Sequence, residues 1–261
     1  MPVCYNKRKG VTGMEHEPYI RMVTGADTAV LFIHGIVGSP AHFKDLLPVI
    51  PEDWSVYNIL LDGHGKEVED FARTSMAKWK AQVSQVLTDL LTTHDRVFIV
   101  AHSMGTLLAI EEAVRRPDEV CGLFLLAVPL VFRVRLRAAL GSMQAALGMA
   151  KPGSVAEQMV NDSSVRLSPQ LHKYLKWLPR FTELTKEALR THVLLPLVNV
   201  PCRAFQSGKD ELVGQTSTEI LQKQPQIITK VLPNSGHFSY SPEDLALLQA
   251  QLKDMLDNLT L

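Results

Sequence analysis

Ser103 lies where the sequence predicts a sharp turn between a buried strand and a helix, in the stretch Ala101-His102-Ser103-Met104-Gly105. Such a turn presents a serine at the carboxyl end of its strand, exposed to substrate, as a nucleophile requires. Strand and helix come close together there, so the positions two before and two after the serine must be small. Ala101 and Gly105 meet that need, although alanine replaces the first glycine of the usual G-x-S-x-G pattern. From the turn alone, an ordinary helix N-cap explains Ser103 as well as a nucleophile does.

Two backbone N–H groups are expected to stabilise the negatively charged oxygen that forms when Ser103 attacks a carbonyl. The first is that of Met104, because the free N–H groups and the dipole of a helix start favour negative charge. The second lies in the loop from His34 to Pro40, whose glycines let main chain approach the substrate. We expect Ile36 to supply it. His34 is expected to bond to nearby main chain and hold the loop, and not to act as a base.

Serine is a weak nucleophile at neutral pH and needs a general base, which in turn needs an acid to orient it. Asp210 follows one predicted strand in the motif SGKDELV, and His237 follows the next strand in the motif NSGHF. Both loops therefore lie at the sheet edge that carries Ser103, and the chain order Ser, Asp, His is that of triads on this architecture. Glu211 competes with Asp210 for the acidic role, but the G-x-D spacing favours Asp210.

The other histidines near this edge are expected to be structural. Asp62 and His64, in the motif LDGHG, should shape their own loop, although His64 could also line the site. His102 adjoins Ser103, but its side chain is expected to leave the turn in another direction. There is no HExxH motif or matching His/Cys cluster, so we expect neither a catalytic metal nor another cofactor. The remaining histidines have no partner that the sequence identifies: His16, His42, His94, His172 and His192.

The composition is that of a single α/β unit: 261 residues, 46% of them hydrophobic, with no long polar tract. Lys plus Arg and Asp plus Glu both number 27, so the formal net charge is +0 and nucleic-acid binding is not expected. The three cysteines form no CxxC pair, which favours a reducing compartment. No secretory signal or membrane span is recognisable, so we expect a cytoplasmic protein without stable membrane insertion. The sequence leaves a homodimer open.

Short apolar runs bounded by glycine, proline or aspartate alternate with helical patterns along the chain. The runs are rich in Val, Ile, Leu or Phe, which is typical of strands buried on both faces of a parallel sheet. Helical periodicity covers Ser75 to Leu91, Met104 to Arg115 and Glu243 to Leu256. The alternation predicts a doubly wound, mostly parallel α/β sheet. The predicted strands are Ala29 to Ile33, Val56 to Leu60, Arg96 to Ala101, Gly122 to Leu126, Pro201 to Gln206 and Ile227 to Leu232.

One segment, 129–196, contains no clear strand and has helix-forming stretches broken by prolines. A structureless loop of that length is improbable inside a compact domain, so we expect a helical insertion, or cap, over the carboxyl edge of the sheet. The hydrolase core is then formed by 1–128 and 197–261. The apolar residues of the cap, Met143, Met149, Met159 and Leu175 among them, indicate an apolar acyl or alkyl group, although most should only pack the cap on the core. The candidate substrate contacts are Gly35, His102, Leu130, Phe132, Trp177, Val213 and Phe238.

The motifs FIHGIVGSP, LDGHG, VAHSMG, SGKDELV and NSGHF follow one another between Leu31 and Phe238. Together they resemble the α/β-hydrolase superfamily, and within it the bacterial carboxylesterase and monoacylglycerol-lipase-like group. The resemblance implies an α/β-hydrolase fold, a triad of Ser103, Asp210 and His237, and a helical cap between the sixth and seventh strands over an acyl pocket. Two departures stand out: Ala101 replaces the usual first glycine, and LDGHG lacks the arginine often found in RGHG.

These residues predict a serine hydrolase that acts on carboxylic esters, a small-molecule substrate class, through an acyl-enzyme. A thioesterase or an amidase would use the same triad. A haloperoxidase-like enzyme or a carbon–carbon bond hydrolase is known on this scaffold, but no residue here favours either. A non-catalytic receptor for small molecules is a third alternative on the same fold, although a receptor need not keep Ser103, Asp210 and His237 together.

Overall fold

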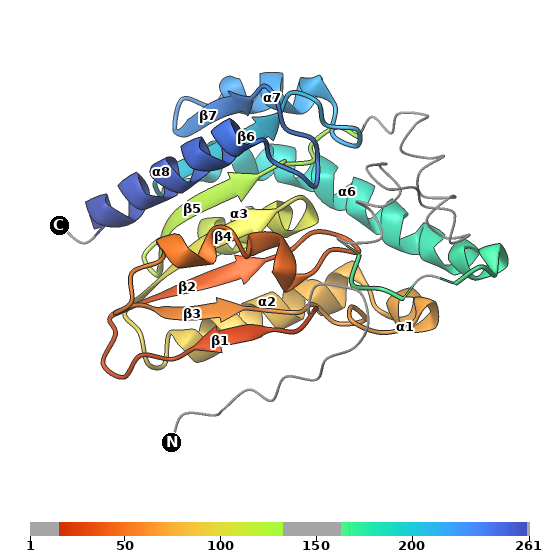
Figure 1. Cartoon of the computed structure of the whole chain (residues 1–261), viewed down its shortest axis with the longest axis horizontal. Coiled ribbons are helices and arrows are strands. Elements are labelled where there is room, and N and C mark those ends of the chain that lie inside the picture. Colours follow the sequence, from red (N-terminus) through yellow and green to blue (C-terminus); the bar gives the residue numbers. More distant parts are fainter. Residues whose placement is uncertain (1–15, 133–162, 167, 260–261) are drawn as a thin grey trace.

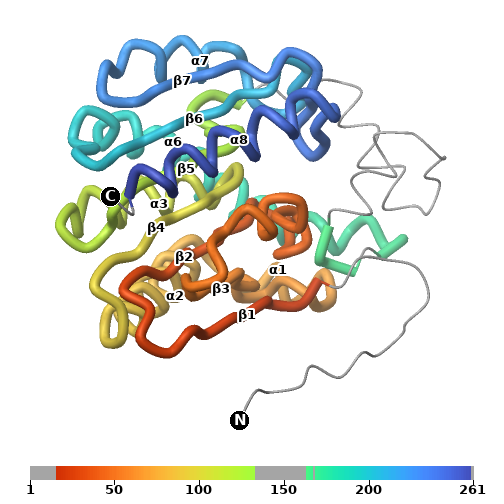
Figure 2. The backbone as a smooth tube through the Cα atoms, turned by 60° about the vertical axis from the view of Figure 1, so that its left-hand side comes forward, coloured from red at the N-terminus to blue at the C-terminus, as the bar shows by residue number. Residues whose placement is uncertain are grey.

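The computed structural model describes residues 16–132, 163–166 and 168–259. Its strands form one seven-stranded sheet in the order β1-β3-β2-β4-β5-β6-β7 (Figure 1). Strand β1 pairs antiparallel with β3, and all the other pairs are parallel. Figure 2 shows the strands stacked in this order, with β1 at one edge and β7 at the other. The strands are β1 (Tyr19–Arg21), β2 (Thr28–Ile33), β3 (Ser55–Asn58), β4 (Arg96–His102), β5 (Val120–Leu126), β6 (Cys202–Ser207) and β7 (Ile227–Leu232).

The described helices lie on both faces of the sheet, which confirms the predicted doubly wound α/β fold. All six predicted strands are present as β2 to β7, and the three predicted helices are α2, α3 and α8. The α-helices are α1 (Val68–Arg73), α2 (Met76–Leu90), α3 (Met104–Arg115), α6 (Leu178–Leu194), α7 (Gln215–Gln222) and α8 (Pro242–Leu259). Short 3-10 helices are η1 (Pro40–Phe43), η2 (Leu47–Val49), η3 (Leu171–Trp177) and η4 (Leu195–Leu197).

The hydrophobic core has two halves, one on each face of the sheet. In β4, Val97, Ile99 and Ala101 belong to the half that α2, α3 and α6 cover, whereas Phe98 and Val100 belong to the half that α8 covers. This alternation follows from the two-residue period of a strand, and both sets are apolar because both faces are buried. Both faces of the sheet are therefore packed against helices, and the loops at the carboxyl ends of the strands begin from this packed core.

The segment 129–196 follows β5 and precedes β6, so it enters after the fifth of the described strands. The resemblance places this insertion between the sixth and seventh strands. The numbers differ by one because the described sheet has a single strand, β1, before β2. The described part of the segment is helical over η3, α6 and η4. Met143, Met149 and Met159, expected to be apolar cap residues, lie outside the described residues. No helix of the described ranges is both long and apolar enough to cross a bilayer.

Helix α6 is fixed on the core by both apolar and charged contacts. Leu184 and Ala188 are buried in the same half of the core as α2 and α3. Beside them, Lys80 of α2 contacts Glu187 of α6 at 3.0 Å and Glu111 of α3 at 2.6 Å. The two carboxylates are largely buried, so removing Lys80 would leave them unpaired and destabilise the packing of the three helices. The described end of the cap is thus attached firmly to the core.

Candidate active site

Ser103, Asp210 and His237 converge at the carboxyl edge of the sheet. Ser103 follows β4 directly, Asp210 lies just beyond β6, and His237 lies just beyond β7. His237 Nε2 is 3.1 Å from Ser103 Oγ, and His237 Nδ1 is 2.8 Å from Asp210 Oδ2. All three residues are buried, with between 3% and 6% of their surface exposed. The structure therefore brings together the three residues that the sequence singled out, in a continuous chain of hydrogen bonds.

The backbone of Ser103 has the strained conformation of a nucleophile turn. Its torsions are φ 50° and ψ −124°, in a region that residues with a side chain rarely adopt. The side chain makes no capping hydrogen bond to α3, and its hydroxyl faces His237 instead. An ordinary N-cap does not account for this geometry. Gly105 permits it, because a Cβ there would lie 2.2 Å from the carbonyl oxygen of Ile33.

Asp210 is held by the start of the loop that follows it. Its Oδ1 accepts hydrogen bonds from the N–H groups of Leu212 and Val213, each at 2.8 Å, which leaves Oδ2 for His237. Burial acts to raise the pKa of Asp210, but the positive field and hydrogen bond of His237, with the two N–H donors, outweigh it and hold the pKa below its usual value. Asp210 is therefore an ionised acceptor at neutral pH.

Glu211, the competing acid, has a different place. Its Oε2 accepts the backbone N–H of His237 at 3.2 Å, so it supports the histidine loop rather than the imidazole. Asp244 of α8 ties the same loop from the other side, since its Oδ2 accepts from Ser235 Oγ at 2.6 Å and from Asn234 N at 2.9 Å. No sequence motif points to the roles of Glu211 and Asp244, because a carboxylate beside a loop has no characteristic spacing.

His102 and His42 lie behind His237. His102 Nε2 donates to the carbonyl oxygen of His237 at 3.0 Å, and the ring of His42 stacks on that of His102 with centroids 3.8 Å apart. Burial, followed by the fields of neighbouring histidines, holds the pKa of His102 well below its usual value, so the ring is neutral. His102 is only 2% exposed. His102 thus supports the backbone of His237, and its contact with substrate stays a prediction. His42, without an identifiable partner in the sequence, also lies 3.2 Å from the hydroxyl of Tyr240.

His34 and His64 hold loops, the structural roles anticipated for them. His34 Nδ1 donates to the carbonyl of Gly35 at 2.8 Å, and its Nε2 accepts the N–H of Leu61 at 3.0 Å. His64 Nδ1 lies 3.2 Å from the carbonyls of Leu61 and Asp62. Burial lowers the pKa of His34 well below its usual value and that of His64 to about 4. The neutral imidazole of His34 therefore joins the loop after β2 to the loop after β3, whereas that of His64 bonds within the loop after β3.

The loop after β2 lies against Ser103. A Cβ on Gly35 would lie 2.8 Å from Ser103 Cβ, so only glycine lets the main chain come this close. The N–H of Gly38 donates to the carbonyl of Gly35 at 3.1 Å and closes the turn around Ile36. Met104 is the first residue of α3, so its N–H has no acceptor within the helix. Both expected oxyanion donors thus belong to main chain that adjoins Ser103.

The apolar candidates divide into two groups. Phe132 and Val213 form an antiparallel bridge just beyond Asp210, and the ring of Phe238 packs edge-on against His237 with centroids 4.7 Å apart. These three adjoin the loops that carry Asp210 and His237. Trp177, by contrast, donates its indole N–H to the carbonyl of Val68 at 2.9 Å and packs on Phe71, which are contacts of the cap with α1. Leu130 is also buried, at 3% exposure.

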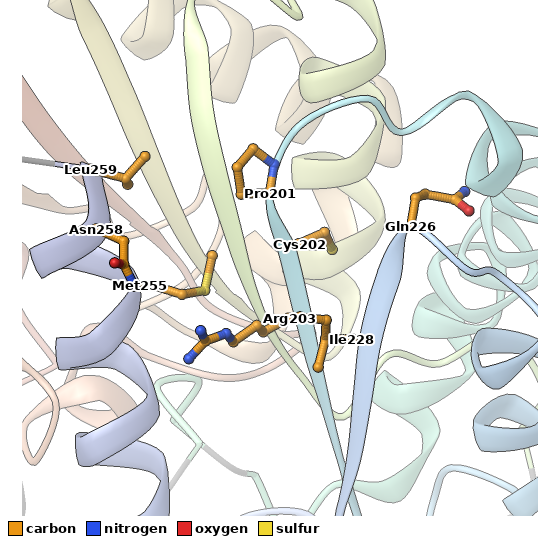
Figure 3. A pocket seen from close by; sticks show the side chains of 8 residues that line it. All are labelled: Pro201, Cys202, Arg203, Gln226, Ile228, Met255, Asn258 and Leu259. Atoms are coloured by element: carbon orange, nitrogen blue, oxygen red, sulfur yellow. The ribbon is translucent and has the colours of Figure 1, made fainter. Parts of the chain in front are cut away.

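A cavity of about 220 Å³ lies at the amino ends of β6 and β7, away from the carboxyl ends that carry the candidate site (Figure 3). Cys202 and Ile228, which line it, are at the amino ends of β6 and β7, whereas Asp210 and His237 follow the carboxyl ends. This cavity is therefore not part of the site around Ser103. In the described ranges, no group of three or more His, Cys, Asp or Glu side chains is arranged to hold a metal ion.

A mostly parallel sheet with a strained serine turn, an acid and a histidine in this chain order is the architecture of α/β hydrolases. The chain belongs to that family: the sequence profile described as "Alpha/beta hydrolase family" matches residues 30–248.

Among characterised proteins, the thermostable monoacylglycerol lipase of Bacillus sp. (strain H-257) is 26% identical over 196 residues, which is 74% of each chain. Among solved structures, one reported for the metagenome-derived lipolytic enzymes LipS and LipT has a TM-score of 0.71 at 21% identity, over 94% of this chain and 100% of that one. A soluble variant of monoglyceride lipase from Saccharomyces cerevisiae has a TM-score of 0.67 at 14% identity, over 92% and 90% of the two chains. The chain is thus a lipase/esterase-like α/β hydrolase.

Proposed function

We propose that this chain is a serine hydrolase of carboxylic esters with an apolar acyl group. The observation that carries the proposal is the hydrogen-bond chain from Ser103 Oγ to His237 Nε2 and from His237 Nδ1 to Asp210 Oδ2, at 3.1 and 2.8 Å. The similarity to a monoacylglycerol lipase supports an ester as the substrate class. The strained turn of Ser103 adds support, because strain at a buried polar residue is retained where chemistry needs it.

In the first half of the reaction, His237 takes the proton of the Ser103 hydroxyl as the serine oxygen attacks the ester carbonyl. The carbonyl oxygen becomes an oxyanion, which the N–H groups of Ile36 and Met104 stabilise. Asp210 holds His237 in the tautomer that leaves Nε2 free to accept, and it stabilises the imidazolium that forms. The intermediate then collapses, the carbon–oxygen bond to the alcohol breaks, and His237 gives its proton to the departing oxygen.

In the second half, water takes the place of the alcohol. His237 accepts a proton from the water as its oxygen attacks the acyl carbonyl on Ser103, and the same two N–H groups stabilise the second oxyanion. Collapse releases the carboxylic acid and returns the proton to Ser103. Besides the ester, the two halves together consume one water molecule. Phe132, Val213 and Phe238 adjoin the catalytic loops, and we assign them to the wall that contacts the apolar part of the substrate.

A fluorophosphonate probe tests the nucleophile directly, because it reacts with an activated serine and remains attached. The wild-type protein should be labelled on Ser103, Ser103→Ala should not be labelled, and Ser163→Ala, which removes a hydroxyl elsewhere, should be labelled as fast as wild type. Turnover should fall by about a million-fold in Ser103→Ala. Absence of labelling in the wild type, or equal labelling of Ser103→Ala, would refute the proposed nucleophile.

The substrate class needs a second measurement. Nitrophenyl esters of graded acyl length should show kcat/KM rising with chain length from acetate, because each added methylene buries further apolar surface. Matched oxygen esters, thioesters and amides of the preferred acyl group then separate an esterase from a thioesterase or an amidase. A higher kcat/KM for the thioester or the amide than for the ester would assign the same residues to a different reaction.

A further inference from the structure

A short stretch of the cap, 163–166, lies across the loop that carries the expected oxyanion donor Ile36. The N–H of Ser164 donates to the carbonyl of Val37 at 3.1 Å, and its hydroxyl donates to the carbonyl of Gly38 at 2.6 Å. Ser164 is 3% exposed, so neither bond competes freely with water. Two consecutive carbonyl groups of the oxyanion loop are thus bound by one residue that lies 126 positions away in the chain.

The loop needs such support because its backbone is strained. Val37 has φ 50°, in the left-handed region, where a β-branched side chain is strongly disfavoured. Residues in such conformations persist only where their surroundings over-determine them. Within the loop, the hydrogen bond from the N–H of Gly38 to Gly35 closes the turn, and the two bonds from Ser164 hold its outer side.

The stretch is itself anchored on elements other than the oxyanion loop. Val165 is 2% exposed and belongs to the half of the core that α2, α3 and α6 cover. The N–H of Arg166 donates to the carbonyl of Lys66 at 2.9 Å, and its guanidinium pairs with Glu67 at 3.0 Å. Ser164 therefore connects the oxyanion loop to a stretch that is also bound to the core and to residues 66 and 67.

We propose that Ser164 is a positioning residue that, by binding the carbonyl groups of Val37 and Gly38, fixes the N–H of Ile36 toward the oxyanion. The proposal rests on the function proposed above. An oxyanion exists in the transition state and not in the bound ester, so a misplaced N–H lowers kcat and leaves KM nearly unchanged. A merely structural role of Ser164 would not separate the two constants in this way.

The test compares Ser164→Ala with Ser163→Ala. Among the described residues, the Ser163 hydroxyl bonds to the main chain of Val165 and not to the oxyanion loop. Ser163→Ala therefore removes the same hydroxyl group as Ser164→Ala but leaves the two bonds to Val37 and Gly38 in place. Ser164→Ala should lower kcat by about tenfold or more, short of the 100- to 1,000-fold for deleting a donor outright, with KM within about twofold of wild type. Ser163→Ala should stay within about twofold of wild type in both constants.

A trifluoromethyl ketone, whose adduct with serine carries the oxyanion, gives a second readout. Its affinity should fall in Ser164→Ala by the same factor as kcat, while the unfluorinated ketone binds both proteins alike. Ser164→Cys keeps the volume of the side chain and offers only a weak donor, so it should show an intermediate loss, and it carries the test if Ser164→Ala does not fold.

Unchanged kcat in Ser164→Ala or Ser164→Cys, equal losses in Ser163→Ala, or a loss confined to KM would overturn this role. Labelling of the wild type by the fluorophosphonate separates the two proposals. An unlabelled wild type contradicts the proposed function, whereas a labelled wild type with an unaffected Ser164→Ala contradicts only the role of Ser164.

Discussion

Lowering the pH from 7 to 5 should destabilise the folded chain, and His64 should account for a measurable part of the loss. His64 is 1% exposed, and its Nε2 has no hydrogen-bond partner in the described part of the chain. Burial lowers its pKa from 6.5 to about 4, although the carbonyls of Asp62 and Leu61 act in the opposite direction. At pH 5 the unfolded chain therefore binds a proton at this histidine that the folded chain does not.

The size of the effect follows from linkage. Stability rises with pH wherever the unfolded state binds more protons, so a histidine with a lowered pKa destabilises the fold as the pH falls below 6.5. Between pH 7 and pH 5, with a pKa of about 4 folded and 6.5 unfolded, the loss is about 2 kcal/mol for His64 alone. His34 and His102, both buried with lowered pKa values, change stability in the same direction.

Urea unfolding of wild type and His64→Asn at pH 7 and pH 5 isolates the contribution of His64 to the pH dependence of stability. Any effect of the substitution that does not depend on pH cancels when the free energies of unfolding at the two pH values are subtracted. The free energy of unfolding should fall by about 2 kcal/mol less in the variant than in the wild type. His172, which is exposed on η3, provides the control: His172→Asn should leave the pH dependence unchanged. An equal fall in wild type and His64→Asn would show that His64 is not held neutral by burial.

Two substitutions test the geometry around Ser103. Gly105→Ala places a methyl group 2.2 Å from the carbonyl oxygen of Ile33, so it should lower the free energy of unfolding by about 1–3 kcal/mol and reduce activity. Thermal unfolding and ester turnover measure these two effects. An unchanged melting temperature would contradict the close approach of α3 and β2. Asp210→Asn should lower kcat by about 10,000-fold, because the amide favours the wrong tautomer of His237. Glu211→Gln can still accept the backbone N–H of His237, so its kcat should stay within about tenfold of wild type. Comparable losses of kcat in both variants would mean that the acid has been misassigned.

The positions of Ser103, Asp210 and His237 after their strands could be predicted from the sequence because the signals are local. The serine turn needs small residues at Ala101 and Gly105, and Asp210 and His237 each follow a strand that its apolar run reveals. Helices α2, α3 and α8 could be predicted for the same reason, whereas α6 was expected only as part of a helical insertion. Helix α2 begins after Ser75, whose hydroxyl accepts the N–H of Lys78 as an N-cap.

The elements that were missed give short or weak patterns. Strand β1 has three residues, two of them exposed, and α1 has six, too few to show a helical period. Helix α7 spans eight residues, and only Ser217 and Leu221 are buried in it. In such elements the neighbouring structure decides the conformation, since β1 exists only by pairing with β3.

The supports of the site were invisible for a different reason. Ser164 bonds to the carbonyls of Val37 and Gly38, and His102 bonds to the carbonyl of His237. Because each of these acceptors is main chain, the residue type at the accepting position is unconstrained, and no paired motif marks the contact. Only the fold brings the partners together, across 126 and 135 positions of the chain.

Substitutions of a catalytic side chain and of a residue that only positions main chain should therefore have different effects on the reaction rate. A catalytic side chain acts on the reacting atoms, and its loss removes a step of the mechanism whatever replaces it. A support such as Ser164 acts by fixing a main-chain group, so any side chain that can donate to Gly38 from the same place should serve, and the residue can vary where the serine of the turn cannot. The proposed coupling of Ser164 to the oxyanion loop depends on the backbone arrangement, which explains why sequence patterns point to Ser103, Asp210 and His237 but not to Ser164.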